Sequence, residues 1–86
     1  MTLAELMENA RGAILAMSES TWPEDKKAIL RAMIRLRRAC EQDGRTRAQH
    51  ELEEWISVVQ TCESPRDIAI AKVPEALKNI KERWLA

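Results

Sequence analysis

Apolar side chains recur along the chain at intervals of three and four residues, the spacing that places them on one face of an α-helix. The pattern runs through about residues 3–17, 22–42 and 47–61. The first stripe consists of Leu3, Leu6, Met7, Ala10, Ile14 and Met17. The second consists of Trp22, Ile29, Met33, Leu36 and Cys40, widened on one side by Leu30 and Ile34, and the third of Ala48, Leu52, Trp55, Ile56 and Val59. Each segment is therefore predicted to form an amphipathic helix.

Cap residues predict where these helices begin and end. A Ser or Thr followed three residues later by an acid or amide is typical of a helix start, because the two side chains satisfy backbone N–H groups that lack a partner. The pattern occurs four times, as Thr2–Glu5, Thr21–Glu24, Thr46–Gln49 and Ser64–Asp67. Gly44 is placed to end the second helix, since glycine readily adopts the left-handed conformation found there. Four helices are predicted.

The fourth helix is predicted to be interrupted. Residues 65–72 are compatible with a short helix, and apolar residues continue at helical spacing through Val73, Leu77, Ile80 and Trp84. Pro74 lacks a backbone N–H and disfavours helical geometry at the residue before it. We therefore expect a split or kink at Val73–Pro74. The predicted fold is all-α, a small four-helix bundle-like domain in which residues 1–86 form one unit.

Composition agrees with a helical protein. Hydrophobic residues make up 45% of the chain, which contains no Phe or Tyr and only two Gly and three Pro. This composition favours helices over strands. No apolar run approaches the ~20 residues that a membrane span needs, and the N-terminus lacks the pattern of a signal peptide. We therefore expect a soluble, cytoplasmic protein without a membrane partner. Cys40 and Cys62 lack the spacing of a metal or redox pair and are interpreted as core residues.

Charge is unevenly distributed, although the chain carries 14 basic and 14 acidic residues and no net charge. The segment 26–47 contains two acids and eight basic residues: Lys26, Lys27, Arg31, Arg35, Arg37, Arg38, Arg45 and Arg47. Four of them recur at helical spacing over an arc of about 80° away from the apolar stripe, and we call them the basic ladder: Lys27, Arg31, Arg35 and Arg38. Neighbouring like charges at this spacing repel by roughly 0.2–0.5 kcal/mol per pair. The ladder therefore requires counter-charge or an anionic partner.

Counter-charge is predicted to reach only part of the ladder. Glu24 lies near Lys27 and Glu41 near Arg38 in the same helix. The third helix carries three further acids: Glu51, Glu53 and Glu54. In an antiparallel hairpin about residues 43–45 these acids would face Arg38 or Arg35. Lys27 lies about 16 Å further along the helix, beyond the reach of the third helix. Acids of the first helix could reach it, namely Glu5 and Glu8.

The ladder points to an interaction function. Arg side chains suit bidentate pairing with carboxylates and phosphates, although the same residues would also fit a solvated face with weak ion pairs. We favour a small adaptor, inhibitor or regulator that binds a larger macromolecule, of the kind common among bacterial and phage accessory proteins. The alternative is a nucleic-acid-binding regulator in which Arg45 and Arg47 extend the ladder past the turn. The zero net charge and the acidic segments on both sides of the ladder argue against it.

The three tryptophans, Trp22, Trp55 and Trp84, lie on apolar stripes and are predicted to pack in the core. Trp84 differs from the other two because only two residues follow it. In a fraying last turn its side chain would be exposed unless another helix or subunit covers it. We therefore include it among the candidate partner-binding residues. The wide apolar stripes leave a homodimer or a partner groove open. Gly12 costs about 1 kcal/mol inside a helix, so close packing or a bend is expected there.

Catalysis is not expected. The one histidine, His50, falls with Glu54 and Ser57 on the polar side of the third helix, an arrangement that ordinary helix surfaces often produce. No phosphate-binding loop, metalloprotease motif or calcium loop occurs. The sequence therefore predicts no catalytic residue, metal site or cofactor.

Overall fold

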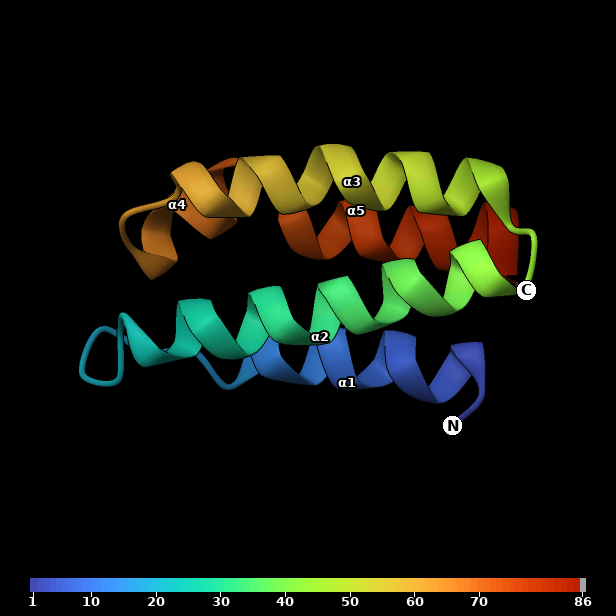
Figure 1. The fold of residues 1–86 in the computed structure, drawn as a ribbon. Helices are drawn as coiled ribbons and strands as arrows, with labels where there is room; N and C mark the ends of the chain where they lie inside the picture. Colours follow the sequence, from blue (N-terminus) through green and yellow to red (C-terminus); the bar gives the residue numbers. More distant parts are fainter. Residues whose placement is uncertain (86) are drawn as a thin grey trace.

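The structure is a computed structural model that describes residues 1–85, and over these residues it is helical without strands (Figure 1). Its elements are α1 (Leu3–Leu15), α2 (Glu24–Gln42), α3 (Thr46–Thr61), α4 (Pro65–Ile70), α5 (Val73–Ile80) and a π-helical turn, η1 (Lys81–Leu85). The all-α prediction is therefore confirmed. A helix with the length and hydropathy of a membrane span is absent from residues 1–85.

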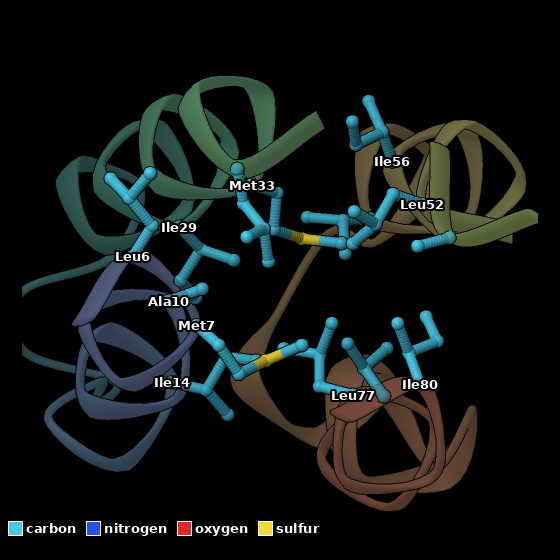
Figure 2. Packing of buried hydrophobic residues seen from close by; sticks show 14 of the residues in the cluster. Leu6, Met7, Ala10, Ile14, Ile29, Met33, Leu52, Ile56, Leu77 and Ile80 are labelled. Atoms are coloured by element: carbon cyan, nitrogen blue, oxygen red, sulfur yellow. The ribbon is translucent and has the colours of Figure 1, made fainter. Parts of the chain in front are cut away.

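Four helices form an antiparallel bundle. α1 pairs with α2, α2 with α3, and α5 packs against both α3 and α1, which closes the ring. Figure 2 looks into the core and shows these four helices around it. The α2–α3 turn, the start of α1 and the end of η1 lie together at one end of the bundle, and α4 lies at the other (Figure 1).

The interior is entirely apolar, since no polar or charged residue among those described is buried. The fully buried large side chains are Met7, Ile29, Met33, Leu36, Leu52, Ile68, Leu77 and Ile80, and most of them are visible in Figure 2. Burying one such side chain contributes roughly 1.5–3 kcal/mol relative to leaving it exposed. Cys40 and Cys62 are buried free thiols, as predicted. Burial raises the pKa of both thiols.

Two of the four predicted caps are present. The Thr2 hydroxyl accepts a hydrogen bond from the Glu5 N–H, and the Glu5 carboxylate accepts one from the Thr2 N–H, both at 3.1 Å. Ser64 accepts one from the Asp67 N–H at 3.3 Å. The first pair satisfies two backbone donors reciprocally, which is how a capping box stabilises a helix start.

The end of α2 follows the prediction for Gly44, which adopts φ 72°. The Gly44 N–H donates to the Glu41 carbonyl at 3.2 Å, and the Arg45 N–H donates to the Cys40 carbonyl at 2.8 Å. These two bonds form a Schellman motif, which satisfies carbonyl groups at the helix end. The sharp turn that results sends α3 back along α2.

The other two predicted caps are wrong. Pro23 occupies the cap position of α2, so the Thr21 hydroxyl turns to the carboxylate of Asp25 instead. The Ser18 N–H donates to the same carboxylate at 2.9 Å. Thr46 already belongs to α3, because the tight turn after Gly44 lets the helix begin one residue earlier than its cap pattern suggested.

The break in the fourth helix lies at Lys72, one residue before the predicted Val73–Pro74 step. α4 ends at Ile70, and Lys72 adopts φ 60°, which starts a new helix in a different direction. Pro74 then falls in the first turn of α5, where a missing N–H breaks no helical hydrogen bond. Val73 is itself helical, contrary to the geometry expected before a proline, so the break precedes the Val73–Pro74 step.

Gly12 lies on the exposed side of α1. A Cβ atom built at this position would meet no other group within 4 Å. The expectation that close packing requires this glycine is therefore wrong.

Candidate functional site

The basic ladder lies on the outer face of α2. Lys27, Arg31, Arg35 and Arg38 are exposed, whereas the opposite side of the same helix supplies fully buried core residues such as Met33. Nineteen residues of continuous helix hold the ladder in place. The candidate surface is therefore fixed by the packing of the bundle rather than by a loop.

Ion pairing divides the ladder into two parts. Lys27 Nζ lies 3.4 Å from Glu24 Oε1, within the first turn of α2. Arg31, Arg35 and Arg38 form no ion pair and no side-chain hydrogen bond with any described residue. Three consecutive rungs therefore keep their charge uncompensated, including Arg38, for which the sequence predicted a partner.

The counter-charge predicted for Arg38 and Arg35 goes to Arg37 instead. Arg37 Nη1 lies 3.3 Å from Glu41 Oε2 and 3.6 Å from Glu53 Oε1 of α3. The physical reason is helical geometry, because consecutive residues are rotated by about 100°, so Arg37 borders α3 while Arg38 points outward. Glu41 was predicted to lie near Arg38, although Arg37 lies four residues before Glu41, the spacing that identifies this pair.

Most of the other acids near the ladder are also engaged elsewhere. Glu5 caps α1, and the hydrogen bonds from Thr2 lower the pKa of its carboxyl. Glu8 Oε1 lies 2.8 Å from Lys81 Nζ, and this hydrogen bond lowers the pKa of Glu8. The Glu51 carboxylate accepts a hydrogen bond from the indole N–H of Trp84 at 2.6 Å. These acids therefore serve the bundle itself, whereas Glu54 of α3 is exposed and forms no ion pair with any residue among 1–85.

A shallow hollow lies on the α2 surface, lined by Ala28, Arg31, Ala32 and Arg35. The two alanines and the two arginines form neighbouring rows, each with the i, i+4 spacing that aligns side chains along a helix. Short side chains on one row beside long ones on the other create the depression. We call this feature the Arg31–Arg35 hollow.

Arg45, Arg47 and Trp84 form a separate cluster at the α2–α3 turn. The Arg45 guanidinium donates to the Trp84 carbonyl at 3.2 Å, and the Arg47 guanidinium lies 5.6 Å from the centre of the Trp84 ring. The Trp84 indole N–H donates to Glu51 of α3 at 2.6 Å, and the side chain is half-buried. These residues were predicted to extend the ladder or to bind a partner. In the structure they hold η1 against α3.

The other tryptophans are only partly buried, although both Trp22 and Trp55 pack against the core as predicted. His50 is exposed and forms no side-chain hydrogen bond with Glu54 or Ser57, whose hydroxyl donates to a backbone carbonyl. Within residues 1–85, no group of three or more His, Cys, Asp or Glu side chains is arranged to hold a metal ion.

No family model matches the chain, and neither a curated protein nor a solved structure matches it. A function for this protein therefore has to be argued from its surface. The most distinctive part of that surface is the row of uncompensated arginines on α2.

Proposed function

We propose that the protein is a small non-enzymatic interaction protein, an adaptor, inhibitor or regulator, that binds an anionic region of a larger macromolecule through the outer face of α2. One observation carries this proposal. Arg31, Arg35 and Arg38 are exposed and form no ion pair among the described residues, while most acids of α1 and α3 that could have paired with them contact other groups.

The arrangement carries an energetic cost without a partner. Arg31 and Arg35 are four residues apart, and such like-charge pairs destabilise a helix by roughly 0.2–0.5 kcal/mol. The negative charges of an anionic partner would attract both guanidinium groups and thereby offset the repulsion between them. Arg also presents several N–H donors in a planar fork, which suits carboxylate and phosphate groups better than a Lys ammonium does.

Nucleic acid binding is the alternative that the same arginines allow. Three free arginines would neutralise about three phosphates, so the logarithm of the affinity should fall with the logarithm of salt concentration with a slope of about −3. Arg45 and Arg47, which would have enlarged the footprint, contact Trp84 instead. A partner protein with an acidic surface is therefore our preferred proposal.

The test is an affinity pull-down from a lysate of the organism that encodes the protein, with wild type compared with the double variant Arg31→Glu/Arg35→Glu. A matched control, Arg66→Glu/Arg83→Glu, changes the charge equally at two exposed arginines that form no ion pair among the described residues. We expect a partner that wild type and the control retain and the α2 variant loses. Binding of generic duplex DNA is measured in parallel at low salt.

The outcomes separate the possible roles of the ladder. A partner retained equally by all three proteins would contradict the proposal. DNA binding that the α2 variant loses would favour the nucleic-acid alternative. Loss of helicity in the α2 variant, measured by far-UV circular dichroism, would mean that the arginines are structural.

A further inference from the structure

We infer that the Arg31–Arg35 hollow receives an acidic amphipathic helix of a partner protein, with an aliphatic side chain over Ala28 and Ala32 and carboxylates on the two guanidinium groups. This inference rests on the proposed function and specifies the chemistry of the partner.

The geometry of the hollow is that of a groove between two helical rows. Ala28 and Ala32 form one row and Arg31 and Arg35 the next, each parallel to the i, i+4 direction of α2. Helices commonly associate by inserting an i, i+4 ridge of one into such a groove of the other, at a crossing angle near −50°. The short alanine side chains let a partner backbone approach, whereas a row of long side chains would hold it away.

The charge spacing matches the same kind of partner. Arg31 and Arg35 are separated by four residues, which is about 6 Å along the helix axis. Two Glu residues at i, i+4 on a partner helix have the same separation, so both carboxylates can meet both arginines in one register. The uncompensated charge of the hollow thus selects an acidic ridge.

Several features of α2 favour a protein over a nucleic acid. The floor of the hollow consists of the methyl groups of Ala28 and Ala32. These groups pack well against an aliphatic side chain, but they provide no hydrogen-bond donor for a phosphate. No aromatic residue occurs between Trp22 and Trp55, so α2 has no platform on which bases could stack. Acids also bracket the ladder, with Glu24 at its start and Glu41 near its end. A long polyanion would meet these acids, and a short acidic ridge would not.

The test uses a synthetic peptide of about 20 residues, long enough for an alanine-based sequence to be helical in water. Its ends are acetylated and amidated, and it carries Glu at i and i+4 with Leu at i+3. One control peptide replaces both Glu by Gln, and a second replaces Leu by Ala. Binding to the full-length, isotope-labelled protein is followed by two-dimensional amide NMR, which also shows where the peptide binds.

Protein variants test the floor and the charges separately. Ala28→Leu fills the hollow and keeps both arginines, and it should be tolerated because Ala28 is exposed. Ala4→Leu places the same side chain at an exposed position of α1 and serves as its control. Arg31→Glu/Arg35→Glu reverses the charge without filling the space.

We expect the acidic peptide to shift amide signals within residues 28–35. Replacing both Glu by Gln should weaken binding about tenfold, because two exposed ion pairs are lost and each of them is weak. Ala28→Leu should weaken it comparably, and Ala4→Leu should not. The Leu→Ala peptide should bind more weakly than the parent peptide.

Other results would overturn the inference in distinct ways. If the peptide causes no shifts while the double reversal still loses its partner from lysate, the acidic helix is wrong and the proposed function stands. Equal binding of the Glu and Gln peptides would exclude charge recognition. Shifts in residues 28–35 caused by duplex DNA and not by the peptide would replace the acidic helix with a nucleic acid. If neither the peptide nor the lysate reveals binding that depends on the arginines, both proposals fail.

Discussion

Replacing Arg31 by Glu should make the protein more stable. In the wild type, Arg31 has Lys27 four residues before it and Arg35 four residues after it, and it has no acidic partner. The substitution removes two repulsive pairs and creates two attractive ones, each worth about 0.2–0.5 kcal/mol. Arg and Glu have similar helix propensities. The free energy of unfolding should therefore rise by about 1 kcal/mol at low ionic strength.

The matched comparison is Arg37→Glu on the same helix. Arg37 contacts Glu41 and Glu53, and its side chain is only 24% exposed. Reversing its charge breaks both pairs and places like charges together, so the free energy of unfolding should fall by about 1–2 kcal/mol. Two arginines of one helix are thus expected to respond in opposite directions.

The assay is urea unfolding followed by far-UV circular dichroism, at low salt and again at about 1 M salt. At the higher concentration the Debye length shrinks to about 3 Å, so both effects should diminish. A loss of stability in Arg31→Glu at low salt would refute the reasoning, because it would mean that Arg31 has a stabilising partner.

Three further predictions concern the bundle. Gly12→Ala should raise the free energy of unfolding by about 0.5–1 kcal/mol in urea melts, since Gly12 is helical and a Cβ there meets open space; an unchanged midpoint would contradict this. Trp84→Phe keeps an aromatic ring but removes the N–H donor to Glu51, so it should lower stability by about 1–2 kcal/mol, and this loss should disappear in a Glu51→Ala background. Lys81 lowers the pKa of Glu8 in the folded protein, so the stability from this pair is present above the ordinary carboxyl pKa of about 4.3 and is lost as the pH falls below it. In urea melts at a series of acidic pH values, the free energy of unfolding of Glu8→Gln should fall less steeply with decreasing pH than that of wild type. Parallel pH dependences of the two proteins would exclude a role for the pair.

The helices and most of the core could be predicted from periodicity. The buried face of α2 consists of Ile29, Met33, Leu36 and Cys40, the residues that its apolar stripe identified. This prediction succeeds because burial of apolar area dominates the energetics and leaves a regular trace in the sequence.

Helix ends were harder to predict, because several local signals compete there. Thr21 has the spacing of a cap residue, but Pro23 occupies the cap position of α2. The Thr21 hydroxyl donates a hydrogen bond to the Asp25 carboxylate instead. The predicted break near Pro74 is present, although Val73 and Pro74 both belong to α5. The break lies at Lys72 because this residue adopts the left-handed backbone conformation. The sequence around Lys72 contains no pattern that predicts this conformation.

The candidate site was predicted as a ladder, but its pairing depends on side-chain direction. One residue along a helix is about 100° around it, which is why Glu53 meets Arg37 and leaves Arg38 free. The contacts of Trp84 join positions 33 and 39 residues apart in the chain. No local pattern carries such information, so these contacts require the fold.

The most direct test of the central claim is the pull-down of Arg31→Glu/Arg35→Glu against wild type, with folding stability measured on the same samples. The account predicts that the double variant is at least as stable as wild type and loses a partner that wild type and Arg66→Glu/Arg83→Glu retain. Retention of that partner by a folded double variant would show that the arginines of α2 do not form the binding surface.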